Sequence, residues 1–299
     1  MLEESERSHV GVFVAARIDV TPAQFAERIS NSAALWKGDA VPATGTFSSP
    51  VRPEDVADLT LHRKDVDAVR DCRPGDCLVK LGAAEIERLR QHAVTDRAMW
   101  HEGVQLEFRR VVLDRIAAYR RGGLRSVPAF HDHPEPVEPE AVFSRLLAVA
   151  QSVIAQEPDV AEYLRHYPQR PLPPGARDYI YWVSTSETPR PTVQALHVVV
   201  HRRGDGGHAE VVAVSRQVFA THYINGSLAI TALLRDPSDP SVRYMVYLNR
   251  SAVDGLGGFF SPLKRFFIER RIRGAAKSAF ERLKQRIAAP ASVRSSGVR

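Results

Sequence analysis

The chain has 299 residues, of which 44% are hydrophobic and 25% charged, so it can bury the core of one large domain or two modest ones. No apolar run reaches the length of a membrane span, and the acidic, polar first residues are unlike a signal peptide. The net charge of +6 is concentrated in Lys264–Arg299, where eleven Lys and Arg face two acids. This segregation argues against a broad nucleic-acid-binding face and favours an anionic surface or a solvated tail.

The first third of the chain predicts a strand followed by helices. Val10–Val20 is rich in β-branched residues, and Thr21-Pro22 then supplies an N-cap and a first-turn proline for a helix that ends near Asn31. Hydrophobic spacing and turn residues predict further short elements, with strands around Thr46-Phe47 and at Cys77–Leu81, and helical turns at Pro53–Leu59 and Asp65–Arg70.

A long helical region follows. Apolar residues at helical spacing run from Ala83 to Arg121, with an interruption at Trp100–Gly103 and a stop at Gly122-Gly123. After a proline-rich loop, helices are predicted at Glu140–Gln156 and Pro158–Tyr167.

The character of the chain changes after Pro168–Asp178, a proline-rich boundary. Five strands in succession are predicted, joined by short connectors such as Asn225-Gly226, which we interpret as a turn. Successive strands with short turns indicate an antiparallel meander. The predicted strands are Tyr179–Val183, Thr192–Arg202, His208–Val218, Ser227–Arg235 and Arg243–Asn249.

The last predicted element is a basic amphipathic helix over Ser261–Ile287, with apolar residues three and four apart on one face. Asp254–Gly258 is interpreted as its hinge. The whole order indicates an α+β fold, in which an antiparallel meander wraps around a long C-terminal helix. We expect one domain over residues 10–287, with a helical insertion at 83–167 and a disordered tail at 288–299.

This order of elements resembles the helix-grip fold of START-like lipid-binding proteins, over roughly Val10–Asn31 and Tyr179–Ile287. The resemblance is one of layout and not of motif. It implies an elongated apolar cavity between the curved sheet and the last helix.

Two cysteines stand in Cys72-Arg-Pro-Gly-Asp-Cys77, where the Pro-Gly turn allows either a small disulfide loop or two free thiols beside a turn. This segment, together with SRQVFATHYINGSLAI and YLNRSAVDGLGG, resembles an uncharacterised bacterial family whose members are often exported. That resemblance implies the disulfide and a signal upstream of the given sequence. A native start at Met1 would instead predict a cytoplasmic protein, and with an upstream signal we expect a periplasmic or secreted one.

Polar and aromatic residues on the meander are the candidate ligand-binding set. If they point into a cavity between sheet and helix, they can hydrogen-bond the polar end of a lipid or an aromatic ligand. The alternative to ligand binding is a structural role, in which His222 and Tyr223 shape a turn. The candidates are Tyr181, His222, Tyr223, Asn225, Tyr244, Tyr247, Arg250 and Phe267.

No cofactor or metal site is predicted. His197 and His201 share a strand face but have no third ligand in the sequence, and His131-Asp132-His133 lies in a proline-rich loop. No nucleophile elbow, zinc-protease motif or phosphate-binding loop occurs.

The leading hypothesis is therefore binding or transfer of a lipid or other hydrophobic small molecule, with the basic helix facing solvent or an anionic membrane. The alternatives are a cyclase-like or hydrolase-like enzyme that uses His222 and a tyrosine in the same cavity, and a scaffold that binds a partner through the helical insertion. A nucleic-acid partner is disfavoured, because the aromatic residues among the basic ones are expected to lie in the hydrophobic core and not to stack on bases.

Overall fold

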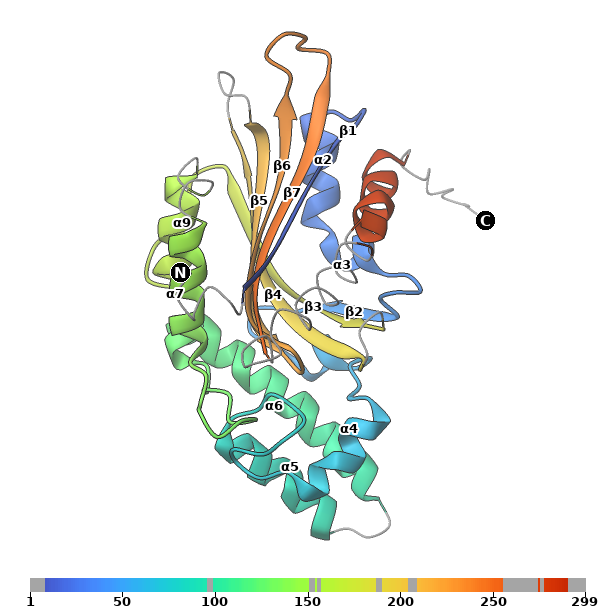
Figure 1. Ribbon diagram of the computed structural model, residues 1–299, viewed down its shortest axis with the longest axis vertical. Coiled ribbons are helices and arrows are strands. Elements are labelled where there is room, and N and C mark those ends of the chain that lie inside the picture. Colours follow the sequence, from blue (N-terminus) through green and yellow to red (C-terminus); the bar gives the residue numbers. More distant parts are fainter. Residues whose placement is uncertain are drawn as a thin grey trace, which may run out of the picture.

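The computed structural model describes residues 9–95, 99–150, 154, 157–186, 190–203, 209–254, 274 and 277–289. The fold is α+β and is built on a seven-stranded antiparallel sheet (Figure 1). The strands are β1 (His9–Arg17), β2 (Ala43–Thr46), β3 (Ala176–Thr185), β4 (Thr192–Arg202), β5 (Ala209–Ala220), β6 (Ile224–Arg235) and β7 (Arg243–Val253).

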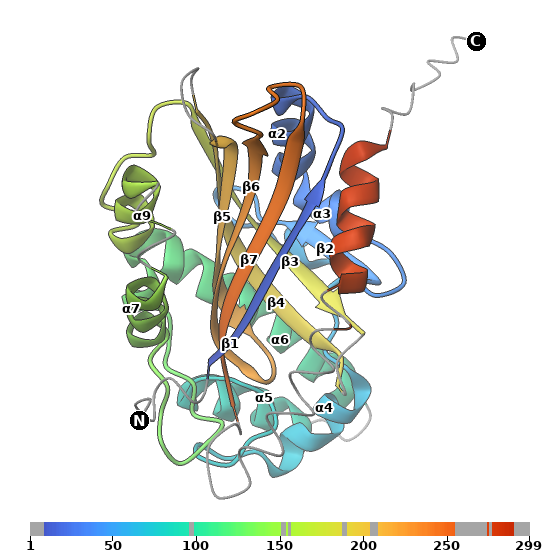
Figure 2. The ribbon, with the colours of Figure 1, turned by 45° about the horizontal axis from the view of Figure 1, so that its top comes forward.

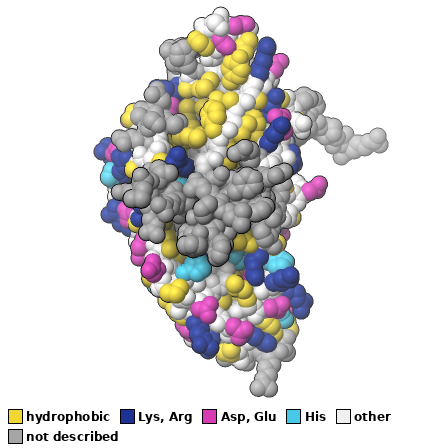
Figure 3. All heavy atoms as spheres, viewed as in Figure 1, with side chains coloured by type: hydrophobic (Ala, Val, Ile, Leu, Met, Phe, Trp, Pro, Cys, Tyr) yellow, Lys and Arg dark blue, Asp and Glu magenta, His cyan; other side chains and the backbone are white. Residues whose placement is uncertain are grey.

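The sheet order is β1-β7-β6-β5-β4-β3-β2. Strands β3 to β7 form the expected meander, in which each strand pairs with the next along the chain. The first strand pairs with the last, and Phe13 lies opposite Leu248. Figure 3 shows hydrophobic side chains gathered over the strands in its upper part, and Phe13 on β1 is 68% exposed.

Helices cover both sides of the sheet. The α-helices in the described part of the chain include α2 (Pro22–Ser30), α3 (Ser32–Trp36), α4 (Arg63–Ala68), α5 (Ala83–Thr95), α6 (Trp100–Gly122), α7 (Pro139–Val149) and α9 (Pro158–Arg165). The 3-10 helices are η1 (Pro53–Val56), η2 (Val69–Asp71) and η3 (Leu124–Ser126). No helix in the described part of the chain combines the length and apolarity needed to cross a membrane.

Alternation along the strands divides the core into two layers, one on each face of the sheet. The inner face, carrying Tyr181, Val198 and Met245, packs against α2, α3 and a C-terminal helix at residues 277–288. The outer face, carrying Trp182 and Val199, packs against α5, α6, α7 and α9. Figure 2 shows α7 and α9 on the opposite side of the sheet from α2, α3 and the C-terminal helix.

Local sequence signals explain where helices begin and end. The Thr21 hydroxyl accepts from the Gln24 backbone N–H at 3.2 Å, and the Gln24 side chain accepts from the Thr21 N–H at 3.0 Å, so a capping box precedes Pro22 in α2. Helix α6 ends at Gly122 and is capped by Gly123, which has φ +71°, a backbone conformation that favours glycine.

Three sequence-based expectations are changed by the structure. The strand predicted at Cys77–Leu81 is wrong: this segment is irregular, because its backbone N–H groups bond to scattered partners such as Asp132 O and Thr221 O rather than to one neighbouring strand. The turn predicted at Asn225-Gly226 is also wrong, since both residues lie within β6. A Cβ at Gly226 would lie 2.7 Å from Val142 Cγ1, so this glycine permits close approach of α7.

The third change concerns the C-terminal helix. Residues 277–288 and residue 274 are helical, whereas most of the expected range Ser261–Ile287 lies outside the described residues, as do Gly255–Gly258 and Phe267. A long C-terminal helix is therefore not shown. The described turns do bury the expected apolar stripe of Phe280, Leu283 and Ile287 against the inner face.

Candidate functional site

A cleft of about 650 Å³ lies between the inner face of the sheet and the C-terminal helix. One wall comes from α3 and the segment after it, and the other wall comes from Ala279, Arg282, Leu283 and Arg286 of the helix. The strands contribute Tyr181, Val183, Thr185, Gln194, Leu196 and Tyr247. The volume is within the range of about 300–1,000 Å³ that small-molecule sites occupy.

The cleft continues into an inner pocket of about 140 Å³. The two spaces share residues from three strands, from α3 and from the C-terminal helix, so they form one continuous hollow. The shared residues are Leu35, Trp36, Tyr181, Gln194, Leu196, Tyr247 and Leu283.

The inner pocket exists because its floor is built from small side chains. Ser215, Ser227 and Ala229 face the pocket from the middle of the sheet, where most inward positions elsewhere carry larger residues. Asn249 Nδ2 donates to Ser227 Oγ at 2.9 Å. The buried Ser215 hydroxyl has no hydrogen-bond partner among the described residues. A mostly apolar cleft thus ends on a polar floor with a spare hydroxyl.

Two arginines fix the helical wall. Arg28 on α2 donates to Arg286 O at 3.0 Å and to Ala289 O at 2.7 Å, which satisfies carbonyl groups at the end of the C-terminal helix. Arg286 in turn donates to Leu35 O at 2.6 Å. A Cβ at Gly38 would lie 2.6 Å from Arg286 Nη2, so the arginine also packs closely against this segment.

The two tyrosines in the cleft are neutral phenols at physiological pH. Burial raises the pKa of Tyr247 to about 12, partly offset by a hydrogen bond with Asn249. Burial also raises the pKa of Tyr181 well above its usual value, and the nearby Tyr179 and Tyr247 phenols add to the effect. These groups can exchange hydrogen bonds with a ligand but are not poised as bases.

The structure separates the residues that the sequence grouped as ligand-binding candidates. Tyr181 and Tyr247 line the cleft. Tyr244, at the start of β7, is 37% exposed. Arg250 follows Asn249 on β7, so its side chain belongs to the outer face. Phe267 lies outside the described residues.

His222 and Tyr223 belong to a tight connection between β5 and β6. His222 is 4% exposed, and its ring nitrogens lie 2.9 Å from Asp65 Oδ2 and 2.9 Å from Leu78 O. Tyr223 adopts φ +60°. Neither residue lines the cleft, so an acid–base pair of His222 with a cleft tyrosine has no geometric support.

Asn225 takes part in a buried ionic network that the sequence did not indicate. Lys80, 1% exposed, places its Nζ 2.9 Å from Asp132 Oδ2, 2.6 Å from Asp254 Oδ2 and 2.7 Å from Asn225 Oδ1. The Asn225 amide completes the network by donating to Asp254 Oδ1 at 2.6 Å. Four segments distant in sequence are thereby joined at one end of the sheet.

The same network includes Asp132 of the His131-Asp132-His133 segment. Ligand atoms of Asp132, His133 and Asp254 lie within 4.8 Å of one another. However, the Lys80 ammonium already contacts both carboxylates and supplies the positive charge that a metal would bring. We therefore assign no metal site here.

Cys72 and Cys77 form a disulfide in the structure. The loop they close is held against the loop at 131–132, distant in sequence, by backbone bonds from Gly75 N–H to His131 O at 2.7 Å and from Cys77 N–H to Asp132 O at 3.1 Å. The disulfide thus lies beside the Lys80 network.

His197 and His201, the other histidines noted in the sequence, have separate partners. His197 contacts Tyr119 and Asp178, whereas His201 Nδ1 lies 3.0 Å from Glu157 Oε2. The two rings therefore do not converge on a shared ligand.

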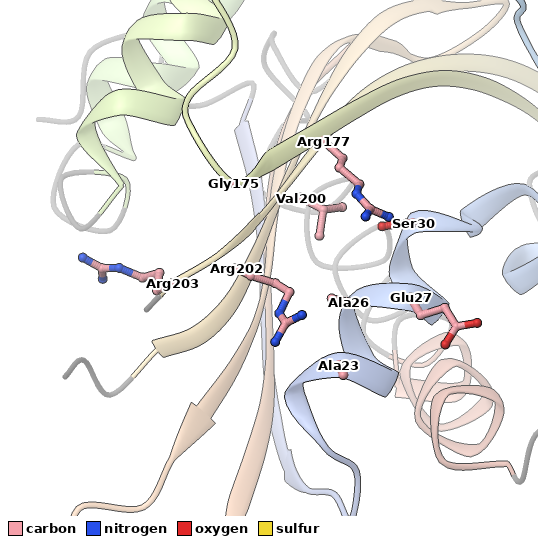
Figure 4. Close-up of a pocket in the computed structure, with 9 residues that line it drawn as sticks. All are labelled: Ala23, Ala26, Glu27, Ser30, Gly175, Arg177, Val200, Arg202 and Arg203. Carbon is pink, nitrogen blue, oxygen red and sulfur yellow. The ribbon is translucent and has the colours of Figure 1, made fainter. Parts of the chain in front are cut away.

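A more open groove of about 440 Å³ runs between α2 and strands β3 and β4 (Figure 4). Arg177 extends toward Ser30 of α2 and Arg202 extends into the groove, whereas Glu27 points away from it. This groove is basic, and its lining is less apolar than that of the cleft.

Comparison with known proteins adds little to these observations. No family model matches the chain, and no curated protein matches it. Among solved structures 16 chains match, one of them described as the crystal structure of Ara h 8.0201, with 8% identity, coverage of 50% of this chain and 90% of that chain, and a TM-score of 0.22. A TM-score this low supports no conclusion about fold or function.

Proposed function

We propose that the chain binds an elongated hydrophobic molecule, such as a lipid, in the cleft between the inner face of the sheet and the C-terminal helix. The observation that carries the proposal is the continuity of the cleft with the inner pocket, which share seven lining residues. Leu35, Leu196 and Leu283 would contact the apolar body of the ligand. The polar floor at Ser215 and Asn249 would receive its polar end.

The arrangement also supports a helix-grip fold as a proposal. Its supports are the pairing of β1 with β7, the two helices between β1 and β2, and a C-terminal helix on the inner face. In this proposal the helical insertion packs on the outer face and leaves the cleft side free. Most apolar side chains of the insertion are used in that packing, but Val94, Met99 and Leu106 are exposed, so a partner-binding scaffold stays the alternative.

The experiment is a binding titration with a dansyl-labelled C11 fatty acid, whose fluorescence rises in apolar surroundings. Leu196 lies in both parts of the hollow, so Leu196→Trp should fill it and weaken binding by about tenfold or more. Leu106→Trp is the matched control, because Leu106 is on α6 and 52% exposed. Equal binding by both variants and the wild type would rule out the cleft as the site.

A second measurement addresses natural ligands. The purified protein would be extracted with organic solvent and analysed by mass spectrometry. We expect a co-purifying hydrophobic compound in the wild type that is depleted in Leu196→Trp and retained in Leu106→Trp.

Docking on an anionic membrane is a further part of the proposal. Lys277 is exposed, and Arg282 lines the cleft from the same helix. Surface cations of this kind contribute about 1 kcal/mol each near anionic lipid. Sedimentation with phosphatidylserine vesicles should therefore exceed sedimentation with phosphatidylcholine vesicles, and should decrease in Lys277→Glu. Equal sedimentation with the two lipids would exclude docking of this kind.

A further inference from the structure

A small basic pocket lies on the outer side of the sheet, apart from the cleft. It has a volume of about 140 Å³ and forms where the ends of α6 and α9 meet α7 and β5. Arg125, Arg165 and Arg216 line it together with His166, whereas Glu140 is the one acid among its lining residues. The pocket therefore carries a net positive charge.

Arg216 is the buried member of this group. It projects from β5, is 2% exposed, and places its guanidinium 4.9 Å from the Tyr119 ring centre and 4.7 Å from that of Phe143. Its two terminal nitrogens donate to Leu164 O and to the Tyr119 hydroxyl. The Nε–H is buried and has no acceptor among the described residues.

No carboxylate in the described part of the chain pairs directly with Arg216. A buried guanidinium in that position is costly, because its charge has lost water and gained only neutral partners. Arg125 and Arg165 do not resemble it, since they pair with Glu140 and Glu162 respectively and are more exposed. Arg216 is thus the member of the pocket with both an unused donor and an unpaired charge.

A directional hydrogen-bond chain partly balances this charge from the far side. Because arginine can only donate, the Tyr119 hydroxyl accepts a hydrogen bond from Arg216. The same hydroxyl donates a hydrogen bond to His197 Nδ1 at 2.6 Å. His197 Nε2–H then donates to Asp178 Oδ2 at 3.0 Å. The balancing carboxylate is therefore separated from Arg216 by two side chains, Tyr119 and His197.

We propose that this pocket binds a small oxyanion, a phosphate or carboxylate group, with the Arg216 guanidinium as the inner cation and Arg125 and Arg165 at the mouth. Charge-assisted bonds from arginine to such groups are among the stronger hydrogen bonds in proteins. The pocket holds several times the roughly 30 Å³ of one water but is smaller than the usual ligand site. It fits a free anion or the anionic end of a larger molecule.

The experiment measures binding of sodium phosphate and of sodium acetate to the full chain by calorimetry and thermal shift, with ionic strength held constant by sodium chloride. We expect at least one of the two anions to bind in excess of chloride, and the preferred one identifies the group. Arg216→Lys keeps the charge but removes the planar guanidinium and its paired donors, and we expect it to weaken binding about tenfold. Binding of neither anion would overturn the proposal.

Exposed residues keep the test decisive if Arg216→Lys does not fold. The double variant Arg125→Ala, Arg165→Ala changes two side chains that are 64% and 48% exposed, so folding should be retained while anion binding weakens severalfold. Arg110→Ala, at an α6 side chain 66% exposed, is the matched control and should bind as the wild type does. Unchanged binding in the double variant would place the anion elsewhere and refute this pocket.

Discussion

His197, the buried histidine of the outer face, should make the free energy of unfolding depend on pH. His197 is fully buried, and burial lowers its pKa to about 4, although the hydrogen bond to Asp178 opposes the decrease. In the unfolded chain a histidine has a pKa of about 6.5. Replacing it with glutamine removes the titrating group while keeping an amide that can donate to Asp178.

The direction follows from proton binding. Because the folded pKa lies below the unfolded one, the unfolded chain binds more protons between the two values. The contribution of neutral His197 is therefore complete above pH 6.5 and is lost as pH falls toward 4. The difference between the two pKa values corresponds to about 3 kcal/mol in total, of which about 2 kcal/mol is lost by pH 5.

The assay is urea denaturation at closely spaced pH values from 7.5 to 4.5, for the wild type and His197→Gln. The free energy of unfolding should fall more steeply with acidity in the wild type, by about 2 kcal/mol between pH 7.5 and 5. Burial acts to raise the pKa of Asp178, but hydrogen bonds from His197 and Tyr163 outweigh it and lower the pKa below its usual value, so this carboxyl titrates below the tested range. His101→Gln, at a side chain 41% exposed, is the matched control for the loss of a histidine that is not buried. Parallel curves for wild type and His197→Gln would refute a neutral, buried His197.

Three further predictions concern stability. Lys80→Met should cost about 3–5 kcal/mol in urea denaturation, because it leaves the carboxylates of Asp132 and Asp254 without their cation, and a cost below 1 kcal/mol would contradict the network. Leu283→Ala should cost about 2–5 kcal/mol, since this side chain is 3% exposed and fixes the C-terminal helix; an unchanged denaturation midpoint would mean that the helix does not dock there. Reduction of Cys72–Cys77 should cost about 2 kcal/mol for so short a loop, measured by denaturation with and without reductant, and no difference would argue that the thiols are unpaired in solution.

The meander was predictable because its signals are local. Each strand from β3 to β7 has β-branched residues bounded by turn residues, and every observed strand end lies within about four residues of the predicted one. The errors occur where tertiary contacts decide the outcome. Asn225-Gly226 has the composition of a turn, yet Gly226 serves the packing of Val142. Cys77–Leu81 has strand composition but lacks a neighbouring strand to pair with.

The location of the candidate site was predictable from the sequence, but most of the residues that form it were not. The resemblance to the helix-grip fold implied a cavity between the sheet and the last helix, and Tyr181 and Tyr247 do line a cleft there. The buried polar residues Lys80, Arg216 and His197 were not assigned their roles, because each depends on partners far away in sequence. The one signal for Arg216 was its place in the apolar strand β5, where an isolated charge needs a specific partner.

The two proposed sites lie back to back on β5, which allows one experiment to separate them. Ser215 faces the inner pocket and Arg216 faces the basic pocket, because successive residues of a strand point to opposite faces. An anion bound at Arg216 should therefore leave the dansyl fatty acid in place, and titration of phosphate or acetate into that complex at constant ionic strength should not lower its fluorescence. Arg282 and Arg286 also line the cleft, so displacement of the fatty acid would mean that the anion binds at these helix residues instead. In that case the cleft itself would be the anion site, and the spare donor of Arg216 would have only a structural role.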